Sequence, residues 1–431
     1  MCPIECFHEN FFIYAKIVIL LRIAKSTLQN VLKNFHIGWK KVIFAFDMKT
    51  LYLFNPENDM ALASGSPFYM LPASIKKMAF DLSALPAWYA SLGGSVLLAN
   101  EKQKIWLEKE CRFPLSVTFV DTISDVYDEV LPWGWSPSLL HRLGESGVLG
   151  DVLISDVRMK QIRDKSSRKM AVEFLPIVRV EQTLGESFFV NNFTKLENLL
   201  SEYDEVILKS PWSGSGKGIQ KVRKTLNDSI YGWAKRIMAS QGGIVVEPYY
   251  QKALDFAMEF YAEEGKLSFV GYSIFETDSR GIYKGNLLAS DEMLEKRLTS
   301  YVPLKVLLDI RRKCLEKLPD LINGAYNGYL GIDMMICLEG ESYKVHPCVE
   351  INLRMNMGIV SRLLYDKYIC QGVEGNYMVE FFQQPGEALQ FHERMKQDCP
   401  LLIENGKINA GYLSLTPVFE DTLYHIFIKV K

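Results

Sequence analysis

Two stretches of the sequence carry residues whose types and spacing could do chemistry. In the first, residues 206–219, an apolar run ends at Lys209 and is followed by three glycines within five positions. Glycines let the backbone approach a ligand closely, and successive amide groups in such a loop can bind phosphate oxygens. Lys209 and Lys217 would add positive charge. The stretch therefore indicates a phosphate-binding loop, with an ordinary flexible loop as the alternative.

Three familiar phosphate-binding motifs do not fit this stretch. A Walker A loop requires a glycine where Pro211 stands and a serine or threonine where Gly218 stands. The dinucleotide fingerprint requires a glycine at Ile219 and a position directly after the first strand of its domain. The H-R-D and D-F-G motifs of protein kinases are absent from the sequence. Any phosphate site here belongs to another class.

The second stretch, residues 345–354, is predicted to be a strand with one polar face. Side chains alternate along a strand, so Glu350, Asn352 and Arg354 share a face. Earlier in the chain, Asp333 stands alone in an apolar strand, where an unpaired carboxylate is unfavourable. If the two strands are neighbours, Asp333, Glu350 and Asn352 offer oxygen ligands to Mg²⁺, or alternatively Mn²⁺. The alternative is a buried ion pair between Glu350 and Arg354.

The elements before these stretches indicate an open α/β domain. Short apolar segments alternate with amphipathic ones, a pattern typical of a parallel sheet. The predicted elements are strands at 51–54, 95–99 and 116–120 and a helix at 82–92. Asn55, Asn58 and Asp59 follow the first strand, where open α/β sheets bind ligands, although a plain turn is the alternative. One charged helix over 158–174 is predicted to open a second, β-rich unit.

Composition limits the class of protein. Of 431 residues, 48% are hydrophobic and 23% charged, which excludes disordered, collagen-like and coiled-coil chains. The net charge of -2 gives no general attraction to nucleic acid. The eight cysteines form no C-x-x-C pair, so we expect neither a disulfide framework nor a zinc site. The apolar run 11–21 is too short to cross a bilayer. We expect a cytoplasmic protein without a membrane or nucleic-acid partner.

The balance of basic and acidic residues changes near Met48. Residues 1–47 carry six basic and three acidic side chains, whereas the remainder carries 43 basic and 48 acidic ones. We therefore predict that residues 1–47 are a dispensable leader and that Met48 is the working start. The other predicted domains are an N-terminal α/β domain at 48–157, a nucleotide-binding domain at 158–384 and a C-terminal tail at 385–431 that packs on the core.

The order of these features resembles the ATP-grasp superfamily, whose members are mostly carboxylate–amine or carboxylate–thiol ligases. The resemblance covers residues 160–365, with the Asp164–Lys165 pair opening the nucleotide domain and Glu350, Asn352 and Arg354 matching an E-x-N-x-R pattern. It departs from many relatives in placing Lys217 inside the glycine loop. The resemblance implies an open α/β domain followed by an ATP-grasp fold, in which two α+β subdomains clamp ATP.

The resemblance also assigns roles. Arg354 and Lys209 would be catalytic, and Asp333, Glu350 and Asn352 would hold the metal ion. The implied nucleotide-binding residues are Lys165, Lys209, Ser213, Gly214, Ser215, Gly216, Lys217, Gly218, Glu247 and Asp255, with Glu259 as the alternative to Asp255. We expect Lys165, Lys209, Lys217 and Arg354 to converge on one cleft.

The implied reaction is an ADP-forming, ATP- and Mg²⁺-dependent ligation. The substrates would be a small-molecule or peptide carboxylate, activated as an acyl phosphate, and an amine or similar nucleophile. Two alternatives are a kinase of this fold and a nucleotide-binding module without turnover. A membrane-attached interaction protein led by residues 11–34 is a weaker third alternative. The sequence does not indicate the oligomeric state.

Overall fold

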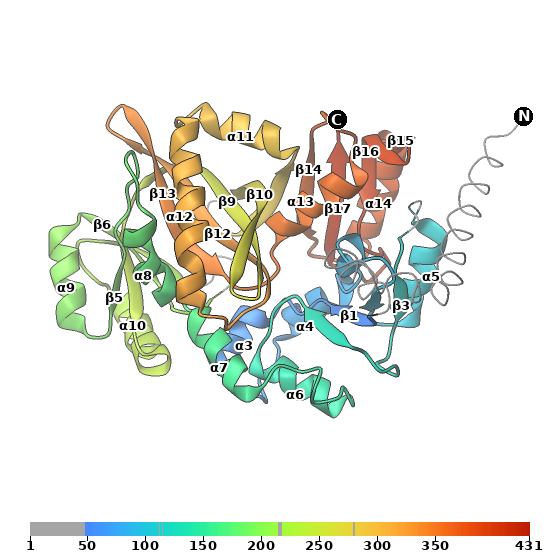
Figure 1. Cartoon of the computed structure of the whole chain (residues 1–431), viewed down its shortest axis with the longest axis horizontal. Helices are drawn as coiled ribbons and strands as arrows, with labels where there is room; N and C mark the ends of the chain where they lie inside the picture. The colour runs from blue at the N-terminus through green and yellow to red at the C-terminus, as the bar shows by residue number, and fades with distance from the viewer. Residues whose placement is uncertain (1–47, 112, 114, 214–217, 279–280) are drawn as a thin grey trace, which may run out of the picture. The chain divides into compact units, whose positions relative to one another are not determined.

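The computed structural model describes residues 48–431 except 112, 114, 214–217 and 279–280. The leader lies outside the described residues, so its dispensability stays a prediction. Residues Lys49–Lys431 pack together as one unit, coloured from blue to red along the chain in Figure 1. Of the helices that the structure describes, none has the length and hydrophobicity needed to cross a membrane.

Four parallel strands form the first sheet, in the order β3-β2-β1-β4. They are β1 (Thr50–Leu53), β2 (Ser95–Leu97), β3 (Thr118–Val120) and β4 (Glu129–Pro132). The accompanying helices are α3 (Asn58–Ser64), α4 (Ala73–Asp81), α5 (Glu101–Glu110) and α6 (Pro137–Glu145). The chain adds β2 and β3 on one side of β1 and then places β4 on the other. The loops after β1 and β4 therefore diverge at a topological switch point.

An antiparallel sheet of four strands forms a separate lobe, in the order β5-β8-β6-β7. Its strands are β5 (Phe188–Val190), β6 (Glu205–Lys209), β7 (Ile219–Arg223) and β8 (Ile244–Pro248). Helices α9 (Phe193–Glu202) and α10 (Asp228–Gln241) accompany the sheet. Val206, Leu208 and Val246 from the strands pack with Leu196 and Ala234 from the helices in one buried cluster. The glycine-rich loop joins β6 to β7 at the end of this lobe.

A nine-stranded sheet makes up most of the rest, in the order β13-β12-β9-β10-β11-β14-β17-β16-β15. Its strands are β9 (Gln251–Glu263), β10 (Lys266–Thr277), β11 (Tyr283–Leu288), β12 (Gly328–Glu339), β13 (Ser342–Asn352), β14 (Gly375–Phe381), β15 (Leu402–Glu404), β16 (Lys407–Ser414) and β17 (Tyr424–Val430). The accompanying helices are α11 (Asp291–Thr299), α12 (Leu304–Ile322), α13 (Met357–Tyr368) and α14 (Glu387–Asp398). The segment after residue 384 belongs to this sheet, because β17 pairs with β14.

Two helices link the first sheet to the lobe, where the sequence predicts one over 158–174. They are α7 (Asp156–Lys165) and α8 (Arg168–Val178). The break falls at Ser166 and Ser167, and the hydroxyl of Ser167 accepts a hydrogen bond from the Lys169 amide as the N-cap of α8. Serine at an N-cap satisfies the free amides of a new helix start, which explains the break. Its consequence is that Arg168 stands at the first turn of α8.

The predicted fold class is confirmed. A parallel α/β sheet comes first, and an antiparallel lobe and a larger antiparallel sheet with helices follow it. The helix predicted at 82–92 is wrong: this segment holds turns and one short 3-10 helix, Leu85–Trp88. Pro86 lacks the amide hydrogen that the interior of an α-helix needs. The domain boundaries inferred from composition stay a prediction.

Candidate active site

The predicted metal-binding residues lie on two neighbouring strands. Asp333 of β12 is directly opposite Glu350 of β13 in the register. The amide nitrogen of Asn352 donates to Oδ2 of Asp333 at 3.1 Å. Burial raises the pKa of Asp333 well above its usual value, and the nearby carboxylates of Glu350 and Glu259 raise it further. The strands are therefore adjacent, as the metal hypothesis requires, while the metal-binding role itself stays a prediction.

Arg354 connects this cluster to the N-terminal sheet. Its Nε and Nη2 each donate to a carboxylate oxygen of Asp59 in α3 at 2.8 Å. Nη2 also donates to Oδ1 of Asn352 at 3.0 Å. Burial lowers the pKa of Arg354, but Asp59 and the neighbouring carboxylates more than offset this, and the net shift is upward. The ion pair between Glu350 and Arg354 that the sequence left open does not form, because Arg354 pairs with Asp59.

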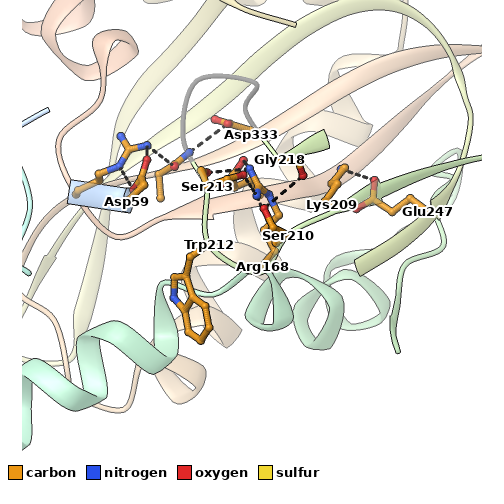
Figure 2. Close-up of polar contacts among 12 residues, drawn as sticks. Asp59, Arg168, Lys209, Ser210, Trp212, Ser213, Gly218, Glu247 and Asp333 are labelled. Atoms are coloured by element: carbon orange, nitrogen blue, oxygen red, sulfur yellow. Dashed lines mark hydrogen bonds and ion pairs between the residues drawn. The ribbon is translucent and has the colours of Figure 1, made fainter. Parts of the chain in front are cut away.

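Glu350 pairs instead with Arg168, a site residue that sequence reasoning missed. Nη2 of Arg168 donates to Oε2 of Glu350 at 2.9 Å. Nη1 donates to the carbonyl oxygen of Ser210 at 2.7 Å and to Oγ of Ser213 at 2.6 Å. Figure 2 shows the Arg168 side chain at the centre of these contacts. The serine pair before it could have located it, since that pair begins a new helix.

Two features of its surroundings disfavour the positive charge of Arg168. It is only 4% exposed, and it occupies a helix N-terminus, where the helix dipole disfavours a cation. Its Nε has no hydrogen-bond partner in the described part of the chain. A buried cation needs compensation, and its acceptors here come from the β6–β7 loop and from Glu350. Loop and carboxylate strand therefore meet at this side chain.

The glycine-rich loop has a hydrogen-bonded base. The amide of Ser210 donates to the carbonyl oxygen of Gly218 at 2.9 Å. Gly218 has a φ of 75°, and a Cβ there would lie 2.2 Å from Oγ of Ser210, so only glycine fits. Ser213 accepts hydrogen bonds from Arg168 at the start of the loop. The predicted phosphate-binding positions outside the described residues are Gly214, Ser215, Gly216 and Lys217.

The two predicted nucleotide-binding lysines have different surroundings. Lys209 is buried, and its Nζ lies 2.5 Å from Oε2 of Glu247 on β8 (Figure 2). Oε1 of Glu247 accepts a hydrogen bond from Ser187 at 3.2 Å. Lys165 is half-buried in the last turn of α7 and forms no hydrogen bond or ion pair with another described residue. The structure thus joins Lys209 to Glu247 and leaves Lys165 unpaired.

The two candidates for the ribose-binding acid differ in exposure. Asp255 is half-buried, and its carboxylate accepts hydrogen bonds from Lys252 and Thr277. Glu259 is 1% exposed, and it accepts from Ser273 at 2.7 Å and from Asn356 at 2.9 Å. Burial raises the pKa of Glu259 to about 7. Only Asp255 has the accessibility expected of a residue that meets a ligand, and the assignment stays a prediction.

A hard cation fits the oxygen cluster. Among the described residues, no lysine or arginine lies within ion-pair distance of Asp333, whose only hydrogen-bond donor is Asn352. A half-buried carboxylate without a paired cation is unfavourable, and an oxygen-only donor set suits Mg²⁺. No three Asp, Glu, His or Cys side chains of the described ranges form a ready-made metal site. The protein would therefore supply only part of the coordination.

Comparison with known proteins identifies structural neighbours only. No protein-family model and no curated protein matches the sequence. A biotin carboxylase from Campylobacter jejuni aligns with a TM-score of 0.49 and 11% identity, over 90% of this chain and 88% of its own. N5-carboxyaminoimidazole synthetase from Staphylococcus aureus, complexed with ADP, aligns with a TM-score of 0.45 and 11% identity, over 89% and 93%. Both are ATP-grasp proteins, the superfamily that the sequence resembles.

Proposed function

We propose that this protein is an ATP- and Mg²⁺-dependent ligase that activates a carboxylate as an acyl phosphate for attack by an amine or similar nucleophile. One observation carries the proposal. Arg168 joins Glu350 to Ser210 and Ser213, so the candidate phosphate loop and the candidate metal ligand meet at one buried guanidinium. Such a junction suits a triphosphate that spans both elements.

The nucleotide would lie between the lobe and the large sheet. Lys209 ends β6, and Glu247 is the last residue but one of β8, which pairs with β6. Asp255 lies on β9 of the large sheet. In this proposal phosphate oxygens replace Glu247 as the partner of Lys209. Asp255 accepts a hydrogen bond from the ribose. Backbone amides of the glycine-rich sequence would bind the phosphate oxygens, as the sequence predicts.

Asp333, Glu350 and Asn352 would hold Mg²⁺, which supplies charge neutralisation at the phosphate oxygens. Asn352 now directs its amide oxygen at Arg354 and its amide nitrogen at Asp333. Loss of the hydrogen bond from Arg354 would free Oδ1 of Asn352 to bind the ion. Arg354, held by Asp59, faces the same cluster and would offset negative charge that develops during phosphoryl transfer.

The chemistry has two balanced steps. A carboxylate oxygen attacks the γ-phosphorus of ATP, the bond to the bridging oxygen of ADP breaks, and an acyl phosphate and ADP form. The nucleophile then attacks the carbonyl carbon, the carbon–oxygen bond to phosphate breaks, and the amine loses a proton to solvent. No side-chain nucleophile is needed, so the protein acts by positioning and by compensating charge.

The test is to incubate the full chain with ATP, Mg²⁺ and separate pools of carboxylates and amines, and to measure ADP and inorganic phosphate for each pool. We expect both products in equal amounts, and only when a carboxylate and a nucleophile are present together. ADP without free phosphate would indicate a kinase. ATP binding without ADP formation in any pool would indicate a module without turnover. Either result would contradict the ligase.

A further inference from the structure

A cleft lies between α3, α6 and α7, outside the residues assigned to the proposed reaction. Its volume is about 670 Å³, within the range typical of small-molecule sites. Figure 1 shows the three helices side by side below the first sheet. Helices α3 and α6 follow β1 and β4, the two strands at the topological switch point. The lining residues come from the end of α3, from α6 and from α7.

Arg163 of α7 is fixed in this cleft by three neighbours. Its Nε donates to the carbonyl oxygen of Leu62 at 2.7 Å. Its guanidinium carbon lies 4.5 Å from the ring centre of Trp212. Gly65 ends α3 with a φ of 67°, and a Cβ there would lie 3.0 Å from Nη2 of Arg163. The terminal nitrogens have no acceptor among the described residues, so a rigidly held guanidinium faces the cleft with free donors.

Together with Arg163, the charged side chains of the cleft are two cations and two anions, balanced but not paired. Lys160 lies one turn before Arg163 on α7, and Asp156 and Glu145 also line the cleft. These four side chains form no ion pair with one another or with any other residue that the structure describes. Two cations and two anions with an apolar wall that includes Met159 suit a ligand with one charge of each sign. A polyanion would meet the two carboxylates.

The cleft adjoins the candidate active site through Trp212. The indole nitrogen of Trp212 donates to the carbonyl oxygen of Arg163 at 3.0 Å. Trp212 also lines the small pocket that contains Asp59, Glu350 and Arg354. In Figure 2 its ring points away from the polar contacts around Arg168. Trp212 thus lines the small pocket and contacts Arg163, which lines the cleft.

We propose that this cleft binds one of the two ligase substrates as a zwitterion of amino-acid or short-peptide size. Its carboxylate is held by Arg163 and Lys160, and its ammonium group lies toward Glu145 and Asp156. This substrate assignment rests on the proposed ligase function, whereas the binding of a zwitterion by the cleft does not. Arg163 is the anchor and Lys160 tunes affinity, because Lys160 is exposed and Arg163 is fixed.

The test uses three probe pools: free amino acids, the same amino acids with acetylated amines, and the same amino acids as amides. Their binding to the full chain is measured without ATP by saturation-transfer NMR and calorimetry. We expect the free amino acids to bind about fivefold more tightly than either modified pool, the effect of one partly exposed charge pair. Equal affinity for the three pools, or no binding to any, would overturn the proposal.

Substitutions that reverse a charge in the cleft test whether the amino acids bind there. Lys160→Glu should weaken free and acetylated amino acids about fivefold, and Glu145→Lys should weaken free amino acids and amides by a similar factor. Lys317→Glu, on the exposed side of α12, is the matched control and should change nothing. Thermal melting verifies that each variant is folded. Equal effects of Lys160→Glu and Lys317→Glu would place the binding elsewhere.

The phosphate-release assay separates this proposal from the ligase. If no pool supports turnover while binding sensitive to Lys160→Glu persists, the ligase is overturned and the cleft remains a zwitterion site. If turnover occurs and Lys160→Glu leaves the KM of every substrate unchanged, the cleft assignment is overturned and the ligase stands.

Discussion

Two clusters of buried and half-buried polar side chains in this protein are built differently. Around Asp333, two strands of the large sheet bring carboxylates together, and the arginines nearby pair with other acids, Arg168 with Glu350 and Arg354 with Asp59. Asp333 itself forms no ion pair with a described residue, although the charge of Arg354 acts on it. The cluster therefore holds unbalanced negative charge in a place where water cannot fully screen it.

The second cluster joins α14 to the C-terminal strands. Nδ1 of His392 lies 2.8 Å from the hydroxyl of Tyr412, which lies 3.2 Å from Nε2 of His425. Ser414 lies 2.8 Å from the same nitrogen and donates its proton to the carbonyl oxygen of Thr416 at 2.6 Å. Burial lowers the pKa of His392 to about 4 and that of His425 to about 3, so both rings are neutral near pH 7.

The difference shows which kind of buried polarity marks a binding site. The histidine cluster is neutral and hydrogen-bonds within itself, apart from Nδ1 of His425. It can therefore stabilise the fold without a ligand. The cluster around Asp333 lacks the cation that would complete it. We infer that unbalanced charge, rather than buried polarity as such, separates the candidate active site from a structural network.

The largest expected effect is that of Glu350→Gln on turnover. Removal of one negative charge should lower ATP-dependent phosphate release by about 100-fold or more, because the charge arrangement carries the catalysis. The free energy of unfolding should change little, since loss of the Arg168 ion pair is offset by relief of repulsion with Asp333. Steady-state kinetics and urea denaturation measure the two quantities. Glu393→Gln, beside His392, is the control and should affect neither.

Undiminished turnover in a folded Glu350→Gln protein would remove the metal assignment. It would also mean that unbalanced charge does not distinguish a functional cluster from a structural one in this protein.

Asp59→Asn should have the next largest effect. Asparagine keeps the shape of the side chain but removes the charge by which α3 holds Arg354. We expect kcat to fall about 10-fold, while the affinity for ATP, measured by calorimetry, stays the same. Asp125→Asn removes an exposed carboxylate beside Lys49 and serves as control. Equal kcat values for the two variants would show that Asp59 does not position Arg354.

The pH dependence of stability should come from the histidine cluster. The unfolded histidines take up protons below pH 6.5, whereas buried His392 and His425 do so only near pH 4 and 3, so stability is lost as pH falls below 6.5. Each contributes about 1.4 kcal/mol per pH unit in that window. Lys396, Glu393 and Glu110 act on His392, and His392 acts on His425.

Urea denaturation at pH 7 and pH 5 measures this loss. Replacement of both histidines by glutamine should flatten the profile between these pH values, even though it lowers stability at pH 7. The same slope in the parent and the double variant would mean that other groups, carboxylates included, govern acid sensitivity.

Much of the fold was predictable because its signals are local. The apolar strands β1, β2 and β3 and the alternation that places Glu350 and Asn352 on one face follow from side-chain type and strand geometry. Arg354, predicted on the same strand, lies beyond its end at Asn352. The helix predicted at 82–92 failed where Pro86 overrides an apolar pattern.

The partners within the site were not predictable in the same way. The Arg354–Asp59 pair joins residues 295 positions apart, and no local pattern selects one acid over another. Arg168 was missed because 158–174 resembles one charged helix, in which its side chain would lie among exposed neighbours. Only the break at Ser167 turns it toward Glu350. Sequence pattern thus locates faces, whereas tertiary packing decides which charges meet.

The smallest predicted effect tests whether the histidine cluster is purely structural. Tyr412→Phe removes the hydroxyl that links His392 to His425 and should lower the free energy of unfolding by about 1–2 kcal/mol, with kcat unchanged. Tyr424→Phe on the neighbouring strand is the matched control, because the hydroxyl of Tyr424 forms no hydrogen bond with a described residue. Equal losses in the two variants would assign the effect to ring packing. A fall in kcat for Tyr412→Phe alone would mean that this neutral network also reaches the active site.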